Sequence, residues 1–163
     1  MKTETRIKIG INKSISADSR TADKVVSKDE LKQSTIQHIN DVRKALDFMN
    51  RELRRKALFH DFSKIDCIDW FYKDFKATQV EKADFKAEGN WFWHHVKSER
   101  HHLNDYCPDD VNLFDVMERI ADITMAGMGR SGKVYDDTLN PDILEKAYKN
   151  TIDLILKNTE VKG

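Results

Sequence analysis

One long amphipathic stripe constrains the fold of this chain more than any other feature of its sequence. Apolar side chains recur at steps of three and four residues; they are Ile36, Ile39, Val42, Leu46, Met49 and Leu53. That spacing places them on one face of an α-helix. Just before the stripe, Ser27 and Glu30 have the spacing of a capping box and predict the start of this helix. Only two prolines interrupt the 163 residues, so the chain as a whole favours helices.

Four further helices are predicted by apolar periodicity and by their end signals: residues 66–78, a segment from 91 to 103, residues 111–125, and a last helix that starts at Pro141. Three glycines, Gly127, Gly129 and Gly132, predict a flexible loop before the last helix. We therefore expect an all-α fold, a compact bundle of about six helices over residues 28–163. Residues 1–27 are expected to form a short N-terminal arm. Residues 6–11 of this arm alternate like a short strand, whereas residues 14–23 show no period.

The composition limits the classes of function. Lys+Arg and Asp+Glu number 28 each, so the net charge is zero, which argues against a nucleic-acid partner or a membrane surface. No apolar run approaches the roughly 20 residues of a membrane span. Cys67 and Cys107 are too few for a disulfide framework, so we expect reduced thiols and a cytoplasmic protein. Assembly into a homo-oligomer stays open.

The histidines indicate a metal site. All six lie between positions 38 and 102, and His60 is followed directly by Asp61. Two consecutive side chains on a helix point about 100° apart, so other segments must supply the remaining ligands of a shared ion. The candidates for those ligands are His38, His94, His95, His101, His102 and Asp122. His95 and His102 are favoured over His94 because they share an apolar helix face, and His101 is intermediate.

His38 can join His60 at one ion only if the chain turns back between them. In an unbroken helix these residues would lie about 33 Å apart, at about 1.5 Å rise per residue. The metal hypothesis therefore predicts a break at Asn50, between antiparallel helices over residues 30–49 and 51–62. Taken alone, His38 is better explained as a hydrogen-bonded residue at the edge of the apolar stripe.

The order His38, His60-Asp61 and Asp122 resembles the HD-domain superfamily of metal-dependent phosphohydrolases. Residues 57–64 (Ala-Leu-Phe-His-Asp-Phe-Ser-Lys) are similar to that family's apolar-His-Asp-x-Gly/Ser-Lys run, and residues 119–126 resemble the segment with its closing aspartate. The resemblance implies a helical core around one divalent ion. The additional histidines resemble members that hold two or more. The chain lacks the Glu-Asp motif of guanosine-tetraphosphate hydrolases and the Gly-Tyr-Pro segment of cyclic-dinucleotide phosphodiesterases, so those substrates are not implied.

Resemblance and residue chemistry together predict hydrolysis of a nucleotide or another small, anionic, phosphate-containing substrate. The expected metal ligands are His38, His60, Asp61, His95, His101, His102 and Asp122. They would hold one or two divalent transition-metal ions, Mn, Fe, Co, Ni or Zn. Asp61 would ligate or bridge and would orient the attacking water, and Lys64 would bind a phosphate oxygen. The rest of the substrate would be held by Arg119, Arg130 and Lys133.

Two other functions stay open. The additional histidines also fit HD-type proteins that hold a di-iron centre and act as oxygenases. Alternatively, the same residues could form a non-catalytic helical module that binds a nucleotide or a partner. The residues also have structural interpretations, since His60-Asp61 can be a helix-surface pair and Lys64 a surface lysine.

Overall fold

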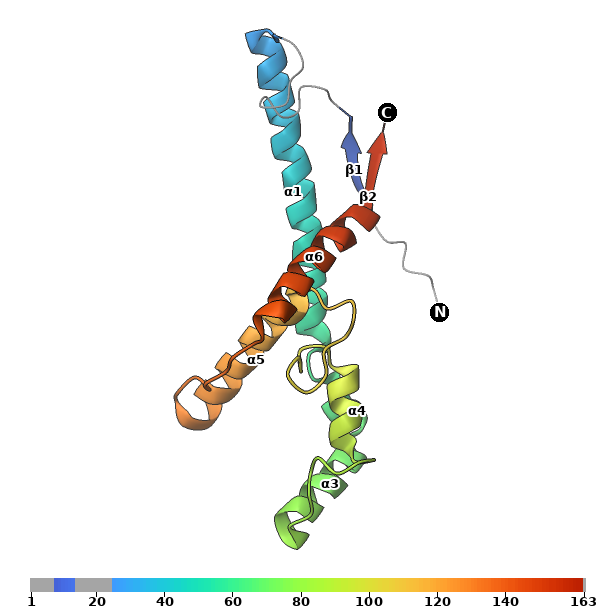
Figure 1. The fold of residues 1–163 in the computed structure, drawn as a ribbon, viewed down its shortest axis with the longest axis vertical. Coiled ribbons are helices and arrows are strands. Elements are labelled where there is room, and N and C mark those ends of the chain that lie inside the picture. Colours follow the sequence, from blue (N-terminus) through green and yellow to red (C-terminus); the bar gives the residue numbers. More distant parts are fainter. Residues whose placement is uncertain (1–7, 14–24, 163) are drawn as a thin grey trace. The chain divides into compact units, whose positions relative to one another are not determined.

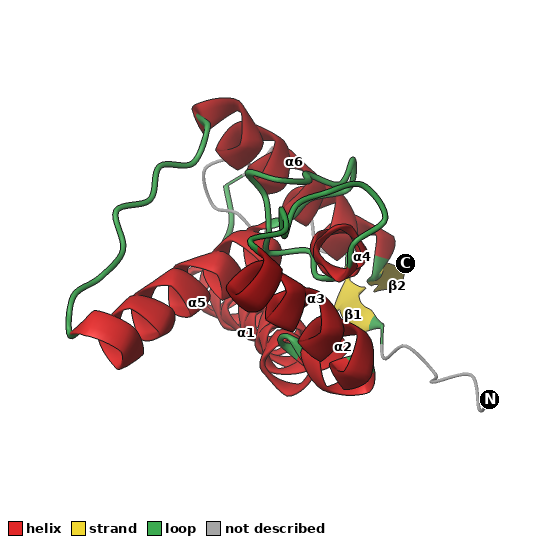
Figure 2. Cartoon of the chain, turned by 90° about the horizontal axis from the view of Figure 1, so that it is seen from below, coloured by secondary structure: helices red, strands yellow, loops and turns green. Residues whose placement is uncertain are grey.

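The computed structural model describes residues 8–13 and 25–162, and this part of the chain is mainly helical (Figure 2). The predicted all-α class is confirmed. The elements in chain order are β1 (Ile9–Asn12), α1 (Lys28–Phe59), α2 (Phe62–Asp66), α3 (Ile68–Glu81), α4 (Trp91–Ser98), α5 (Leu113–Ser131), α6 (Pro141–Lys157) and β2 (Thr159–Lys162). The chain divides into two compact units, Met1–Glu52 with Ile152–Gly163, and Leu53–Thr151. In the described ranges, no helix is long and apolar enough to cross a membrane.

The first unit contains a two-stranded parallel sheet. β1 lies beside β2 and pairs with it (Figure 1). In the register of the pair, Ile9 lies opposite Thr159. β1 overlaps the predicted strand at residues 9–11, whereas residues 6 and 7 lie outside the described residues. Part of the predicted arm thus pairs with β2. The aperiodic segment 14–23 lies outside the described residues.

Helix α1 begins as the sequence predicts but does not break where expected. At its start, Ser27 N–H donates to Glu30 Oε2 at 2.8 Å and Glu30 N–H donates to Ser27 Oγ at 3.3 Å, which confirms the capping box. The predicted break at Asn50 is wrong, because the helix continues to Phe59. The helix contains neither glycine nor proline, and an asparagine in a helix interior costs less than about 1 kcal/mol. The local sequence therefore does not stop the helix.

The second unit has a small apolar core beside α5. Its buried members are Leu103, Val111, Val116 and Ala147. Asp115 of α5 is fully buried and accepts hydrogen bonds from Arg100 Nε and Nη2 at 3.0 and 2.9 Å. Since Arg100 and two of the core residues come from the loop of residues 99–112, the core and the ion pair fix this loop against α5.

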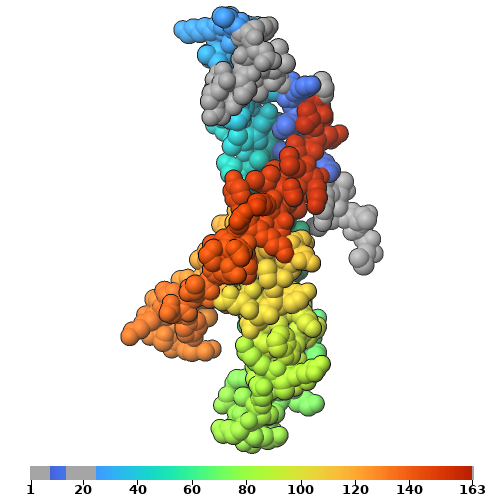
Figure 3. Space-filling view, viewed as in Figure 1, coloured from blue at the N-terminus to red at the C-terminus, as the bar shows by residue number. Residues whose placement is uncertain are grey.

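Helix α4 is shorter than the sequence predicts. It ends at Ser98, so His101 and His102 lie in the following loop and not on a helix face. At the other end of α4, Trp91 N–H donates to Asp74 Oδ2 of α3 at 2.7 Å. The space-filling view shows α3 and α4, in green to yellow-green, packed against each other (Figure 3).

Helix α5 is longer than predicted. The expected flexible loop is wrong at Gly127 and Gly129, which lie inside the helix. α5 ends only at Ser131, and Gly132 caps it with a φ of 70°. A Cβ at Gly127 would lie 2.5 Å from the carbonyl oxygen of Lys133. The close passage of the following chain therefore requires glycine at this position. Arg130 consequently belongs to the last turn of α5 and not to a loop.

Candidate metal centre

His60 and Asp61 form the turn between α1 and α2, because α1 ends at Phe59 and α2 begins at Phe62. Asp61 has a left-handed backbone conformation with a φ of 56°. This conformation is uncommon for residues other than glycine, although aspartate tolerates it better than most. Backbone strain of this kind concentrates at functional sites. The pair therefore does not form the helix-surface pair that its sequence also allowed.

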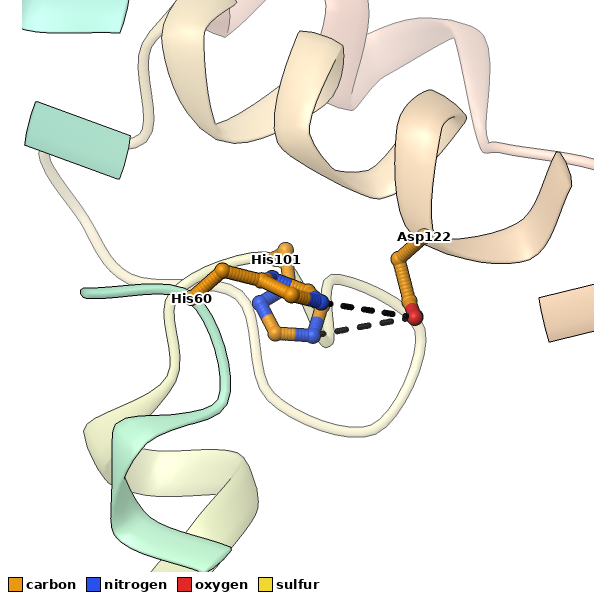
Figure 4. A group of neighbouring side chains, drawn as sticks. All are labelled: His60, His101 and Asp122. Carbon is orange, nitrogen blue, oxygen red and sulfur yellow. Dashed lines mark ion pairs between the residues drawn. The ribbon is translucent and has the colours of Figure 1, made fainter. Parts of the chain in front are cut away.

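A first group of ligand atoms consists of His60, His101 and Asp122. His60 Nε2 lies 3.6 Å from Asp122 Oδ1, and His101 Nε2 lies 3.7 Å from Asp122 Oδ2. Figure 4 shows both imidazole rings directed at the Asp122 carboxylate. Three separate segments supply this first ligand group: the α1–α2 turn, the loop after α4, and helix α5.

A second ligand group consists of Asp61, His95 and His102. His95 Nε2 lies 3.4 Å from Asp61 Oδ1 and 2.8 Å from His102 Nε2. Asp61 also faces the first ligand group, because its Oδ2 lies 3.6 Å from His60 Nε2 and its Oδ1 lies 3.7 Å from His101 Nε2. The Asp61 carboxylate thus connects the two groups, as a residue that bridges two ions must.

The distances within the first ligand group fit a metal ion better than hydrogen bonds. The N···O separations of 3.6 and 3.7 Å exceed the ordinary hydrogen-bond range. Two donors about 2.1 Å from one ion at a tetrahedral angle lie about 3.4 Å apart. Among the described residues, Asp61 Oδ1 and His101 Nε2 are buried without a hydrogen-bond partner. Buried polar atoms are nearly always paired, so these atoms favour an ion as the partner.

Glu118 supports both histidines of the first ligand group. Its Oε1 lies 3.1 Å from His60 Nδ1 and 3.3 Å from His101 Nδ1, and its Oε2 lies 3.1 Å from Lys56 Nζ. Burial alone would raise the pKa of Glu118, but contacts with His101, Lys56 and His60 lower it to about 2. The ionised carboxylate accepts N–H from the far side of an imidazole and leaves Nε2 for an ion. Metal-bound histidines usually have such a partner.

Two contacts fix the ring of His95 in the second ligand group. Its Nδ1 shares a hydrogen bond of 2.7 Å with Ser63 Oγ, and its ring stacks on Trp91 with centroids 4.5 Å apart. Burial and the neighbouring His102 lower the pKa of His95 to about 3. Burial and His101 lower the pKa of His102 to about 4. Both rings are therefore neutral near pH 7, the state in which imidazole binds a metal ion.

Lys64 of α2 lies beside Asp61, with its ammonium group paired to Asp61 Oδ2. Burial alone would raise the pKa of Asp61, but the hydrogen bond and the charge of Lys64 outweigh burial and lower it. Asp61 is therefore ionised, as a ligand must be. The role predicted for Lys64, binding a phosphate oxygen, stays a prediction.

Arg119 makes contacts that differ from the predicted ones. Its guanidinium donates to the two carboxylate oxygens of Asp137 at 2.9 and 2.5 Å, and to the carbonyl oxygen of His101 at 3.3 Å. Arg119 is buried and connects Asp137 to the loop that carries His101, and its predicted contact with a substrate stays a prediction. Arg130 and Lys133 are exposed. Within the described ranges, no hydrogen bond or ion pair joins either residue to the ligand groups.

Six of the seven predicted ligands meet in the two ligand groups: His60, Asp61, His95, His101, His102 and Asp122. His38 is the exception, since it lies exposed on the unbroken helix α1 and belongs to no ligand group formed by the described residues. The break at Asn50 was inferred to bring His38 to the site, so both predictions fail together. His94, ranked below His95 from the sequence, is exposed beside Cys67 Sγ at 3.6 Å.

Glu118 contacts two of the predicted ligands and Lys56 contacts Glu118, but neither residue was predicted from the sequence. Glu118 also forms a third possible ligand group with Glu99 and His101. Glu118 lies four residues before Asp122, and Lys56 lies four residues before His60. Residues four apart on a helix lie on the same face, so this spacing could have indicated both. The charge of these two residues did not by itself indicate a role at the site, because charged residues are common on helix surfaces.

A cavity of about 510 Å³ adjoins the first ligand group. It is lined by residues from the end of α1, the following turn, and α5: Leu53, Lys56, Ala57, His60, Met117, Glu118, Ala121, Asp122 and Met125. His60 and Asp122 belong both to this lining and to the first ligand group. The volume is in the range of sites for small molecules. A ligand in the cavity would therefore reach the candidate metal centre.

The helical fold and the paired ligand groups together define a helical protein with a candidate metal centre. The chain belongs to DUF5662, a family of unknown function, whose model matches residues 27–159. Comparison with curated proteins and with solved structures gave no match. The matched range contains every residue of the two ligand groups. The likeness to the HD-domain superfamily stays a prediction.

Proposed function

We propose that this protein is a metal-dependent phosphohydrolase that hydrolyses a small phosphate ester. One observation supports this proposal most strongly: two adjoining ligand groups share Asp61, and the buried atoms Asp61 Oδ1 and His101 Nε2 face each other at 3.7 Å without hydrogen-bond partners among the described residues. A divalent ion bound there would lower the pKa of a water and offset charge on a phosphoryl oxygen. The resemblance of residues 57–64 to the HD motif favours the same chemistry.

Different residues of the chain would have different roles in hydrolysis. Asp61 and Asp122 are carboxylates within the ligand groups, and either can accept the proton of an attacking water. Lys64 can donate to a phosphoryl oxygen from its place beside Asp61. Glu118 and Ser63 hold imidazole rings from the far side, so that the Nε2 atoms keep their directions when a substrate binds.

The two ligand groups differ in how they are prepared for an ion. In the second ligand group, the Nε2 atoms of His95 and His102 lie 2.8 Å apart and hydrogen-bond each other. In the first ligand group, His60 and His101 have no such bond between their Nε2 atoms. An ion therefore displaces a hydrogen bond in the second group but not in the first. We expect the first group to bind its ion more tightly.

Elemental analysis tests the metal centre directly. Wild-type protein, incubated with Mn, Fe, Co, Ni or Zn and freed of excess ion, should retain one to two equivalents per chain. The double variant His60→Ala/Asp61→Ala should retain less than a tenth of that amount while its circular dichroism stays helical. His94→Ala, a histidine outside both ligand groups, should bind as much as the wild type. Equal metal in the double variant and the wild type would refute the site.

Activity assays then test the reaction. Protein loaded in turn with Mn, Co, Mg, Ni and Fe should release inorganic phosphate from at least one of a panel of mono-, cyclic and polyphosphate esters. Two equivalents of iron together with consumption of oxygen would favour the di-iron oxygenase instead. Metal binding with no turnover of any ester, and unchanged ligand recovered from the protein, would favour a non-catalytic module.

A further inference from the structure

The cavity beside the first ligand group has a mainly apolar lining. Five of its nine lining residues are apolar: Leu53, Ala57, Met117, Ala121 and Met125. They come from the end of α1 and from α5, and His60 and Asp122 line the same cavity. Met117 and Met125 are 45% and 68% exposed, which is more water contact than large apolar side chains usually keep. Methionines adapt to ligands of different shape.

The described lining of this cavity offers no unpaired positive charge. Lys56 is its one cation, and it is paired with Asp115 Oδ1 at 2.5 Å and Glu118 Oε2 at 3.1 Å. Near the ligand groups, Arg119 is engaged by Asp137, and Lys64, paired with Asp61, is the cation that we assign to a single phosphoryl oxygen. A nucleoside polyphosphate carries several negative charges and is usually bound by several cationic groups. The surroundings therefore fit a single phosphoryl group better than a polyphosphate.

We propose that the substrate is a phosphate monoester of an apolar alcohol, with an aryl or medium-length alkyl group that binds in this cavity. The phosphoryl group would lie at His60 and Asp122, and the hydrocarbon would cover Met117, Ala121 and Met125. Hydrolysis forms a P–O bond to the water oxygen and breaks the P–O bond to the alcohol. The proton lost by the water goes to the leaving alkoxide, so the products are the alcohol and inorganic phosphate. This inference rests on the proposed phosphohydrolase function.

Binding of two non-hydrolysable phosphonates tests the inference without turnover. Isothermal titration calorimetry of the Mn-loaded protein should show at least tenfold tighter binding of naphthylmethylphosphonate than of methylphosphonate. Ala121→Phe fills the cavity and should remove this preference. Ala126→Phe makes the same change at an exposed position of α5 outside the lining, and it should keep the preference. Met125→Gln, at an already exposed site, should reduce it about three- to tenfold.

The outcomes separate this inference from the proposed function. If naphthyl, methyl and glycerol phosphates are hydrolysed equally well, and Ala121→Phe changes none of the rates, the substrate class is wrong and the phosphohydrolase stands. If naphthylmethylphosphonate binds with a preference that Ala121→Phe removes, but no ester is hydrolysed, the cavity assignment stands and the function fails. If neither phosphonate binds and Ala121→Phe abolishes a dimer seen by ultracentrifugation, the cavity is a contact between copies and the inference is overturned.

Discussion

Helix α1 and the loop of residues 99–112 differ in how far the sequence determines them and in what they contribute to the candidate site. α1 follows an apolar repeat and a capping box, yet its one histidine, His38, belongs to no ligand group in the described part of the chain. The loop has no repeat, yet it supplies His101 and His102, one to each ligand group. A helix turns successive side chains by a fixed 100°, whereas a loop can direct two neighbouring residues at two adjacent ions. Irregular segments therefore complete this centre, and helices hold them in place.

Removal of one histidine from each region is the clearest test of this difference between α1 and the loop. His101→Ala deletes a candidate ligand whose Nε2 is 3.7 Å from both Asp61 Oδ1 and Asp122 Oδ2. We expect it to lose most of the bound metal, at least a tenfold fall in occupancy at equal free ion. His38→Ala should retain wild-type occupancy, because its side chain is exposed on α1. Both variants are measured by elemental analysis after dialysis against the same ion concentration. Loss of metal in His38→Ala would show that the helix, too, supplies a ligand.

The ion pairs of the two regions should differ in their effect on stability. Asp115 is fully buried and is paired with Arg100 of the loop and with Lys56. Asp115→Ala removes the buried partner that both cations share, so that Lys56 keeps only Glu118 and Arg100 keeps only the exposed Asp110. We expect it to lower the free energy of unfolding by about 3 kcal/mol. Asp41 on α1 pairs with Lys44 near the surface, so Asp41→Ala should cost less than about 0.5 kcal/mol. Urea unfolding of the metal-free proteins measures both changes. Equal costs would contradict the view that the loop depends on its buried ion pair.

Acid should weaken the metal-free protein through the histidines of the second ligand group. Their pKa values are lowered from 6.5 to about 3 for His95 and about 4 for His102. Below pH 6.5 the unfolded chain therefore binds protons that the folded chain does not bind, and stability falls as the pH drops. We expect a loss of about 2 kcal/mol per histidine between pH 7 and pH 5, on the order of 4 kcal/mol for the pair. His95→Gln/His102→Gln should show a smaller loss over the same interval, measured by urea unfolding in the presence of a chelator. An equal loss in both proteins would exclude these histidines as the cause.

Features that depend on apolar periodicity and on residue type could be predicted from the sequence. The C-terminal ends of helices and contacts between distant segments could not. The all-α class and the start of α1 at Ser27 followed from local patterns, and six of the seven residues predicted as ligands lie together in the two ligand groups. The end of α4 at Ser98 could not be predicted in this way. The residues of the loop 99–112 are fixed by their partners in the core and the ion pair, and these partners lie on α5 and α6. The predicted role of His38 was wrong because it required a break in α1 at Asn50, and α1 is continuous there. Packing between distant segments decides such points, and a single sequence does not record it.

Two glycines of α5 differ in their contact with the irregular chain that follows this helix. Gly127 and Gly129 are both helical, but only a Cβ at Gly127 would meet the following chain, at 2.5 Å from Lys133 O and 2.7 Å from Tyr135 N. Gly127→Ala should therefore lower stability by about 1 to 2 kcal/mol, since backbone atoms must move. A Cβ at Gly129 meets no atom within 4 Å, so Gly129→Ala should raise stability by about 0.5 to 1 kcal/mol through its helix propensity. Opposite shifts of the urea midpoint would show that the chain after Gly132 packs on α5, and shifts of the same sign would show that it does not.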